Sequence, residues 1–391
     1  MLHLPIKTLA IEKIQKGYPW VFAQDLQLKK FPAAKPGDLV YLTTPTSEPI
    51  AIGYINPLTK LCCRVLTLNT DSTLDENFFL ERFTTALSFR EHKFSSPFYR
   101  LVHAESDALP GLVIDRFGDT LVCQTNTAGM EKLKPLWFSA LQTLLKPKRV
   151  IFRDDVPLRS KEGLELSISA PIGDLETLIE VEENGLTFYA DPKSGQKTGW
   201  FYDQRLNRHW IAERACGKTV LDLYTYSGGF GIAAAGKGAK HVTLVDSSEH
   251  ALMLVKQAAT TNHVLSSCEL IREQVFLLLP RLIAAKQKFE LVIADPPAFV
   301  KQANHKAVGL RGYQKLSFLA SQLVAPGGMF FIASCSHHAT SHDFRQAVEQ
   351  GIQKAQRQFQ LLRKGGADTD HPIHPLLPQT HYLKSLTYKL N

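Results

Sequence analysis

The sequence predicts an α/β protein whose second half is a mostly parallel β-sheet, preceded by a small β domain and an α+β domain. In the second half, short apolar runs alternate with amphipathic stretches of helical spacing, a rhythm typical of right-handed β-α-β units. In the first half, β-branched runs broken by turn signals precede a region of mixed spacing. At 391 residues the chain is also longer than one hydrophobic core usually supports, so several domains are expected.

Three domains are expected, over residues 1–72, 73–178 and 179–391. The first holds strand-like runs broken by turn signals such as Asn56-Pro57. The second combines strand-like runs with two stretches of helical spacing, over residues 75–92 and 130–145. The third is the parallel sheet, with strands expected at residues 219–224, 241–245, 289–294 and 329–334 and helices at residues 249–262, 275–285 and 313–323.

The composition is that of an ordinary globular protein. Hydrophobic residues make up 44% and charged residues 21%, and no apolar run approaches the ~18 residues that a membrane helix needs. The first 17 residues alternate apolar and charged side chains, unlike a secretory signal. Six cysteines lack a Cys-x-x-Cys pair or a His cluster, so no disulfide framework and no metal site are expected. We therefore expect a cytoplasmic protein without a membrane partner.

Positive charge is concentrated in the second half of the chain. Residues 1–183 carry a formal charge of −2 and residues 184–391 carry +10, out of +8 for the whole. Such a balance predicts an anionic partner, of which a polyphosphate backbone is the commonest, although the attraction is not specific.

The first strand of the sheet runs into a glycine-rich turn, from Thr225 to Gly231. Glycines allow a backbone to approach a ligand closely, and the following helix presents free N–H groups. The glycine spacing of this turn also fits a loose form of the dinucleotide-binding motif. A glycine-rich turn that binds no ligand would show the same spacing. However, Asp222 lies at the end of this strand, and a carboxylate suits the cationic S-adenosylmethionine better than a pyrophosphate. The methyl donor is favoured.

The next two strands also end in polar side chains. Asp246 ends the second strand, where a carboxylate can accept hydrogen bonds from ribose hydroxyls. The serines after Asp246 are more simply explained as the N-cap of the helix that follows. After the third strand, Glu273 or Gln274 could accept a hydrogen bond from an adenine amino group, or either could be solvated surface.

The fourth and fifth strands end in the residues with the most chemical promise. Asp295 is followed by Pro296 and Pro297, which stiffen the turn and hold the carboxylate at the strand mouth beside a substrate. Cys335 leaves the fifth strand between two serines. As a thiolate it would be a nucleophile, but isolated cysteines are also common as small buried apolar residues.

A basic and aromatic segment precedes the sheet, from Asp191 to Arg208. Phosphates attract basic side chains and bases stack on aromatic ones, so residues 200–202, Trp-Phe-Tyr, suggest a nucleic-acid surface or a cofactor edge. A strand entering a helix with a solvated basic face is the alternative.

Taken together, these motifs resemble a known family. They are Gln196-Lys-Thr-Gly199 with Asp203-Gln-Arg205, the run from Asp222 to Gly231, Asp295-Pro-Pro-x-Phe299, Leu310-Arg-Gly-Tyr313 and Ser334-Cys-Ser336. The combination resembles the bacterial 23S ribosomal RNA cytosine-C5 methyltransferases of the large subunit. Near the start, residues 16–22 resemble the opening of that family's PUA RNA-binding domain, and residues 105–117 resemble its central domain.

The resemblance implies a Rossmann-like class I methyltransferase sheet of seven strands, with S-adenosyl-L-methionine as the cofactor. It implies Cys335 as the nucleophile that adds to carbon 6 of the cytosine, and Asp295 as the group that holds the base. Residues implied at the cofactor are Gln196, Lys197, Thr198, Gly199, Asp203, Asp222, Tyr224, Ser227, Gly228, Asp246, Ser247 and Gln274. Residues implied at the substrate are Pro296, Pro297, Phe299, Arg311 and Tyr313.

The same resemblance implies 23S ribosomal RNA, naked or in a partly assembled large subunit, as the partner, and a homodimer is compatible with it. Two positions depart from the pattern. Ala298 follows Pro297 where many such enzymes carry a second cysteine, so the base that removes the carbon-5 proton is unassigned. Gln274 replaces an expected acidic residue.

Three other functions remain alternatives. A sister ribosomal RNA methyltransferase acting on guanine would need no nucleophilic cysteine. A non-catalytic RNA-binding assembly factor would not need Asp222, Asp246 and Asp295 at three strand mouths. A dinucleotide-dependent oxidoreductase is the third.

Overall fold

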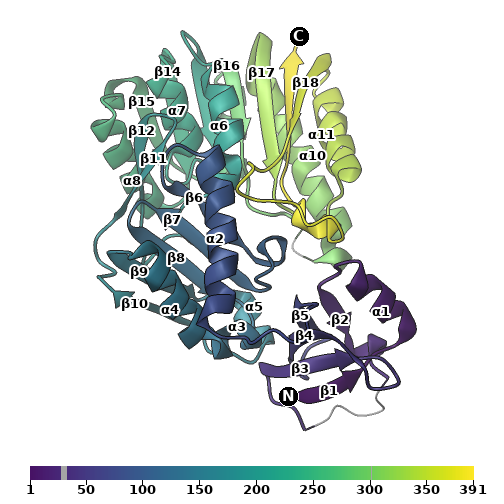
Figure 1. Cartoon of the computed structure of the whole chain (residues 1–391). Coiled ribbons are helices and arrows are strands. Elements are labelled where there is room, and N and C mark those ends of the chain that lie inside the picture. Colours follow the sequence, from purple (N-terminus) through teal and green to yellow (C-terminus); the bar gives the residue numbers. More distant parts are fainter. Residues whose placement is uncertain (28–32, 301) are drawn as a thin grey trace. The chain divides into compact units, whose positions relative to one another are not determined.

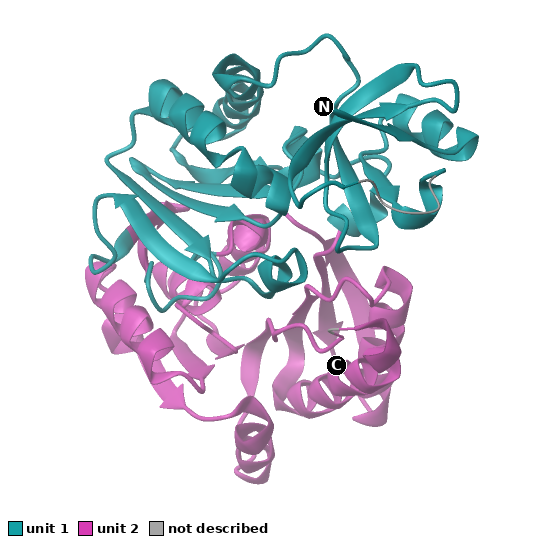
Figure 2. Ribbon diagram, turned by 90° about the horizontal axis from the view of Figure 1, so that it is seen from below, with its two compact units in different colours: residues 1–179, 191–200, 369–380 teal, residues 180–190, 201–368, 381–391 magenta. Residues whose placement is uncertain are grey.

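The computed structural model describes residues 1–27, 33–300 and 302–391. It divides into two compact units, shown in Figure 2. Unit 1 comprises Met1–Ile179, Asp191–Trp200 and Thr369–Thr380, and unit 2 comprises Glu180–Ala190, Phe201–Asp368 and His381–Asn391. The expected division into three domains stays a prediction, because unit 1 holds both of the first two.

The N-terminal part of unit 1 is a five-stranded sheet in the order β1-β3-β4-β5-β2. Alternate side chains of its strands, such as Val40 and Leu42, are fully buried and form its core together with Ile14 of the first helix. Its elements are β1 (Leu2–Pro5), α1 (Thr8–Gln15), β2 (Trp20–Phe22), η1 (Ala23–Asp25), β3 (Asp38–Thr43), β4 (Pro49–Ile55) and β5 (Leu61–Thr67).

A second five-stranded sheet, in the order β10-β9-β8-β7-β6, completes most of unit 1. Trp137 and Phe79, from two different helices, are fully buried in its core. Its elements are α2 (Glu76–Lys93), β6 (Phe98–His103), η2 (Ala104–Asp107), β7 (Leu112–Phe117), β8 (Thr120–Thr125), α3 (Ala128–Lys132), α4 (Lys134–Leu145), β9 (Arg149–Asp154), α5 (Pro157–Lys161) and β10 (Ser167–Ile172).

The single helix expected over residues 130–145 is wrong, because the structure has two helices there. α3 ends at Lys132 and α4 begins at Lys134. Pro135 lies in the first turn of α4, and in a continuous helix its ring would clash with the carbonyl of Glu131. The chain therefore breaks at Leu133 and restarts with the proline where its missing N–H costs nothing.

Unit 2 is built on the predicted seven-stranded sheet, in the order β15-β14-β13-β16-β17-β19-β18 (Figure 1). The first five strands in this order pair in parallel, and the last two pairs are antiparallel. The strands are β13 (Thr219–Leu223), β14 (His241–Asp246), β15 (Cys268–Arg272), β16 (Phe289–Ala294), β17 (Val324–Ser334), β18 (Phe359–Gly365) and β19 (Lys384–Leu390).

Helices cover the sheet, and a two-stranded hairpin precedes it. The core on one face combines strand residues with Leu278 of α9, Leu316 of α10 and Phe344 of α11. The helices of the unit are η3 (Tyr202–Gln204), α6 (Arg205–Ala212), α7 (Gly229–Gly236), α8 (Glu249–Thr261), η4 (Leu265–Ser267), α9 (Val275–Ala284), η5 (Ala303–His305), α10 (Lys306–Leu323) and α11 (Ser341–Lys354), while η6 (Pro378–Thr380) belongs to unit 1. The hairpin is β11 (Ile179–Glu183) with β12 (Leu186–Ala190).

Strand β13 sets where a ligand can bind. It pairs with β14 on one side and β16 on the other, so the connections leaving these strands diverge and open a crevice at their carboxyl ends. α7 packs tightly there, because a Cβ added at Gly231 would lie 2.4 Å from Leu244 and 3.0 Å from the carboxylate of Asp222. Only glycine permits this approach.

Within the described residues, no helix is both long and apolar enough to cross a membrane. The same residues contain no group of three His, Cys, Asp or Glu side chains that could hold a metal ion.

Candidate active site

A buried carboxylate lies at the end of β13. Asp222 is 1% exposed, and its Oδ2 accepts hydrogen bonds from the Thr225 hydroxyl at 2.6 Å and the Gly231 N–H at 2.8 Å. Its Oδ1 has no hydrogen-bond partner among the described residues. Burial raises the pKa of Asp222 to about 7. The orphan oxygen of a buried acid is costly unless a ligand satisfies it.

The loop after β13 has a strained backbone. Tyr224, Tyr226 and Gly228 have φ angles of 61°, 50° and 87°, and the two tyrosines lie in a region that side chains other than Gly rarely adopt. Ser227 between them is buried, and its hydroxyl has no partner among the described residues. Such strain, kept beside unsatisfied polar atoms, is typical of a ligand site.

The end of β14 supports this loop. Asp246 accepts hydrogen bonds from the N–H of Tyr226 at 3.0 Å and of Ser248 at 2.9 Å. Ser248 caps α8, as expected, and Ser247 is exposed. A carboxylate has lone pairs left after two bonds, so Asp246 can still accept from ribose hydroxyls. At the end of β15, Gln274 is exposed, while Glu273 accepts from Arg281 at 3.2 Å.

Two further carboxyl groups, those of Asp203 and Asp295, belong to the same site as Asp222. Asp203, in η3, is buried; its Oδ2 accepts from the Tyr382 hydroxyl at 2.5 Å and its Oδ1 has no partner among the described residues. Burial first, and then the charges of Asp203 and Asp222, raise the pKa of Asp295 to about 7, against the opposing effects of Arg208 and Gln204. Three acids expected from separate motifs therefore form one negative cluster.

Cys335 lies directly after the last residue of β17, and the residue is half-buried. Its neighbours Ser334 and Ser336 are fully buried, and the Tyr313 hydroxyl lies 2.8 Å from the hydroxyl of each. The cysteine is therefore not sealed in the core; it stands between two anchored residues at the same edge of the sheet as Asp295.

The loops that carry Asp295 and Cys335 are tied together. The N–H of Val300 donates to the Ser336 hydroxyl at 3.2 Å, and the N–H of Phe299 donates to the Tyr313 hydroxyl at 3.4 Å. The Phe299 ring stacks on that of Tyr313 with centroids 4.8 Å apart. Both loops are thus held by one side chain of α10.

Comparison with known proteins agrees with this geometry. Residues 167–363 match the model of an S-adenosylmethionine-dependent methyltransferase, and residues 4–68 match that of a PUA-like domain. The Ribosomal RNA large subunit methyltransferase I of Tolumonas auensis is 36% identical over 386 residues, covering 97% of this chain and 96% of the relative. That of Cronobacter sakazakii is 34% identical over 378 residues, covering 95% of each.

The chain belongs to the S-adenosylmethionine-dependent rRNA large subunit methyltransferases. A solved structure from Streptococcus mutans, assigned to the S-adenosylmethionine-dependent methyltransferases, shares the fold with a TM-score of 0.82 at 21% identity and covers 100% of both chains. Family membership makes S-adenosylmethionine the cofactor and excludes the dinucleotide-dependent alternative.

The residues of this methyltransferase fit that cofactor. S-adenosylmethionine is a cation with ammonium and hydroxyl donors. Three atoms of this site have no hydrogen-bond partner among the described residues, and they are acceptors or a hydroxyl: Oδ1 of Asp222, Oδ1 of Asp203 and Oγ of Ser227. A pyrophosphate would instead meet a cluster of negative charge. Burial is the main cause of the raised pKa values of Asp222 and Asp295 in the free protein. The charge of Asp246 raises the first further, and the charges of Asp203 and Asp222 raise the second further.

Other expected site residues of the methyltransferase are placed less directly. Gln196, Lys197, Thr198 and Gly199 belong to unit 1, so their contact with the cofactor stays a prediction. There Thr198 is buried and its hydroxyl donates to the Trp200 carbonyl at 3.4 Å. At the substrate side, Pro297 and Arg311 are exposed, Phe299 is half-buried and Pro296 is buried.

Tyr313 was expected to touch substrate, and this contact stays a prediction. In the structure its side chain is fully buried and its hydroxyl is shared by Ser334 and Ser336, so it anchors both serines. Lys384 was not expected at all, although its strand pairs it with Ser334. Only the antiparallel register of β17 and β19 reveals it.

Proposed function

We propose that this methyltransferase methylates carbon 5 of a cytosine in 23S ribosomal RNA, with Cys335 as the nucleophile. The relatives are named for the RNA of the large ribosomal subunit. The observation that carries the choice of cytosine is a half-buried cysteine held between two anchored serines, at the strand edge that also presents Asp295. A guanine methyltransferase has no use for such a thiol.

The thiol supplies what cytosine lacks. Carbon 5 is too weak a nucleophile to accept a methyl group unaided, so the Cys335 thiolate forms a bond to carbon 6 and the ring electrons move toward carbon 5 and N3. When bound, S-adenosylmethionine supplies an electrophilic methyl group on its sulfonium to carbon 5. Covalent attachment thus divides one difficult step into easier ones.

Asp295 has the proton affinity that this addition needs. Because its pKa is raised to about 7, a large share of the carboxyl is protonated near neutral pH and can donate a proton to N3 as that nitrogen gains electrons. After methyl transfer, the proton on carbon 5 goes to a base, its bonding pair restores the double bond, and the Cys335 thiolate leaves. N3 then returns its proton to Asp295.

The base that takes the carbon-5 proton is not assigned to a side chain. Ala298 stands where related chemistry often places a second cysteine, and it is half-buried in the loop between β16 and α10. An alanine cannot accept a proton, so the acceptor is another group or water.

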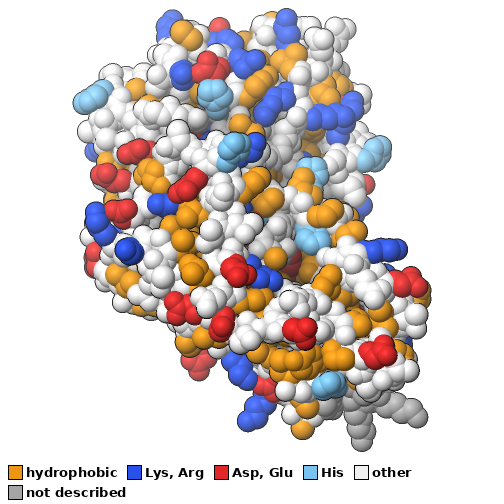
Figure 3. All heavy atoms as spheres, viewed as in Figure 1, with side chains coloured by type: hydrophobic (Ala, Val, Ile, Leu, Met, Phe, Trp, Pro, Cys, Tyr) orange, Lys and Arg blue, Asp and Glu red, His pale blue; other side chains and the backbone are white. Residues whose placement is uncertain are grey.

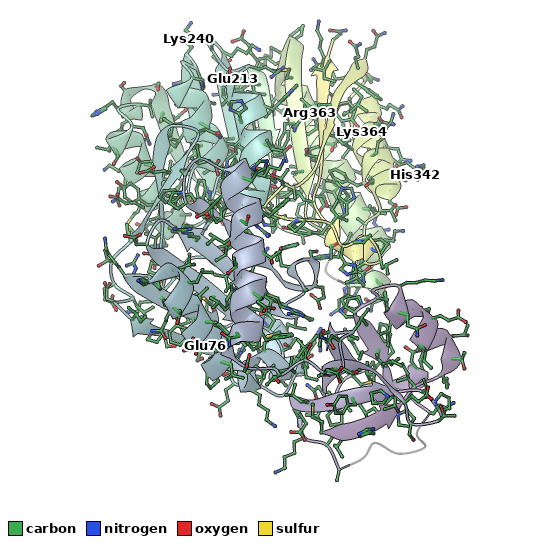
Figure 4. The ribbon with its side chains drawn as sticks, in the orientation of Figure 1. Glu76, Glu213, Lys240, His342, Arg363 and Lys364 are labelled. Atoms are coloured by element: carbon green, nitrogen blue, oxygen red, sulfur yellow. The ribbon has the colours of Figure 1, made fainter. Side chains whose placement is uncertain are left out.

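RNA recognition follows from the charge and the needs of the chemistry. The half of the chain from residue 184 carries +10. Figure 3 shows Lys and Arg side chains, with some Asp and Glu, over the upper part of unit 2, and there Figure 4 labels Lys240, which lies at the edge of the sheet where β14 begins. A stacked base must leave its helix to reach the thiol. We propose naked or partly assembled 23S RNA as substrate and the cytoplasm as the place of action; a homodimer stays a prediction.

The test is methylation of 23S RNA by the wild-type chain and by Cys335→Ala, with Cys216→Ala, an exposed cysteine, as the matched control. Nucleoside mass spectrometry should show 5-methylcytosine with the wild type and the control and none with Cys335→Ala. Methylated guanine in place of methylated cytosine, or 5-methylcytosine that survives Cys335→Ala, would overturn the proposal.

A further inference from the structure

We propose that Lys384 is a positioning residue for Cys335: it holds the turn that follows the thiol and supplies the positive charge that favours the thiolate. This rests on the nucleophilic role proposed above. Lys384 begins β19, the antiparallel neighbour of β17, and lies opposite Ser334, the residue before the thiol.

Its burial is the first observation that calls for an explanation. Lys384 is 7% exposed, and a lysine is rarely buried unless its ammonium is satisfied. The ammonium donates hydrogen bonds to the carbonyls of Ser336 and Ala339, both at 2.7 Å. These carbonyls bracket the turn directly after Cys335, so the lysine fixes the path of the chain at the thiol.

Its charge is the second observation. Carbonyl oxygens satisfy N–H donors but leave a buried cation without a counter-charge, and burial lowers the pKa of Lys384 accordingly. The group that opposes this effect is Cys335, whose ionised form raises the pKa of Lys384. The interaction is mutual, because a thiolate that stabilises the ammonium is stabilised by it to the same extent.

Among the described contacts, the other polar groups near the thiol are engaged with further partners. Tyr313 approaches from α10, and its hydroxyl is engaged by the two serines. From the turn itself, His337 is exposed and stacks on Tyr382 with ring centroids 5.2 Å apart. Tyr382 in turn donates to Asp203. Lys384 is thus the buried lysine whose charge is coupled to the thiol.

The experiment titrates the thiol directly. Wild-type chain, Lys384→Met, Lys384→Arg and Lys389→Met are alkylated with iodoacetamide across a pH series, and modification of Cys335 is followed by peptide mass spectrometry. Lys389 is an exposed lysine of the same strand and serves as the control. Lys384→Met should raise the apparent pKa of the Cys335 thiol by roughly 1 unit or more, while Lys384→Arg and Lys389→Met leave it nearly unchanged.

Methylation rates across the same pH series give the second readout. Lys384→Met should lower kcat about tenfold at pH 7, with the deficit shrinking as pH rises and the thiol ionises without help. A deficit that is equal at every pH would mean that the lysine only clamps the turn, and it would overturn the assignment of charge. An unchanged thiol pKa in a folded Lys384→Met chain would overturn it too.

Two controls keep the outcomes distinct. S-adenosylmethionine affinity and the unfolding midpoint establish that each variant is folded; if Lys384→Met is not, Lys384→Arg decides, since a thiol pKa raised despite the retained charge would contradict the proposal. Loss of the proposed function is separate. Cytosine methylation that survives Cys335→Ala would refute the nucleophile, whereas the alkylation series would still measure what Lys384 does to the thiol.

Discussion

At the scale of single residues, the site holds carboxyl groups in buried positions that disfavour their ionised form. Asp222 is 1% exposed and has one oxygen without a partner among the described residues. Its pKa is about 7 in the folded chain, so protonation stabilises the fold, and this stabilisation is present at low pH and is lost as pH rises through about 7. The free protein thus gives up stability at neutral pH for a charged ligand site.

Asp222→Asn tests this cost. The amide oxygen can accept the two hydrogen bonds made by Oδ2, from Thr225 and Gly231, while no charge remains to be buried. Urea unfolding at pH 8 should show the variant more stable than the wild type by on the order of 1–3 kcal/mol, with a smaller gain at pH 5. Cofactor binding should be lost. A variant that is less stable at pH 8 would show that the carboxylate is satisfied in the free protein.

The affinity for S-adenosylmethionine should itself depend on pH. Ionised Asp222 and Asp295 attract the cation, and both have pKa values of about 7. Affinity measured by calorimetry should rise between pH 5.5 and 7.5, by roughly threefold to tenfold. In Asp222→Asn any residual binding should depend less on pH, and a wild-type affinity that falls over this range would contradict the acidic cluster.

At the scale of elements, α10 organises the chemistry by joining two loops. Its Tyr313 hydroxyl holds Ser334 and Ser336 on either side of the thiol and accepts from the N–H of Phe299. Close packing allows this, since a Cβ added at Gly309 would lie 2.6 Å from the Phe299 carbonyl oxygen. The loops of Asp295 and Cys335 are therefore anchored to the same helix.

Tyr313→Phe separates packing from hydrogen bonding. The ring keeps its stacking on Phe299, but two buried serine hydroxyls lose their shared partner, which costs about 1–3 kcal/mol. We expect a lower unfolding free energy in urea and a lower kcat with nearly unchanged cofactor affinity. Val308→Ala, an exposed position of the same helix, is the control. An unchanged kcat would mean that the hydroxyl does not position the thiol.

The elements themselves were largely predictable. Buried parallel strands read as continuous apolar runs, and β13, β14 and β16 appear where such runs predict them. α10 begins at Lys306, ahead of the expected residue 313, because its first turns lack a clear apolar face. The sequence around Lys384 does not indicate its role, because that role depends on pairing with a strand about 50 residues earlier in the chain.

At the scale of the whole molecule, the excess of positive charge predicts salt-sensitive RNA binding. The second half carries +10, and binding that releases counterions from phosphates weakens steeply as salt increases. Filter binding of a 23S RNA fragment should lose at least about tenfold in affinity between 50 and 200 mM salt. Cofactor affinity should change much less over the same range. Salt-independent RNA binding would contradict the electrostatic account.

Some features of the site depend on the whole fold and could not be predicted from the sequence. The sequence alone predicts that Asp222, Asp246 and Asp295 stand at the ends of parallel strands, which share one edge of the sheet, and the structure places them there. Their effect on one another needs the structure, because burial, and then the charge of Asp203 some 90 residues earlier, raise the pKa of Asp295. The roles of Gln196 to Gly199, which belong to unit 1, stay predictions.

The most direct test of the account is to trap the bond between protein and base. An RNA substrate in which the target cytosine carries fluorine at carbon 5 cannot lose a proton there, so the thiolate cannot leave after methyl transfer. Incubation with S-adenosylmethionine and peptide mass spectrometry should find the methylated nucleotide attached to Cys335. Trapping at another residue, or full turnover without any adduct, would contradict the central claim.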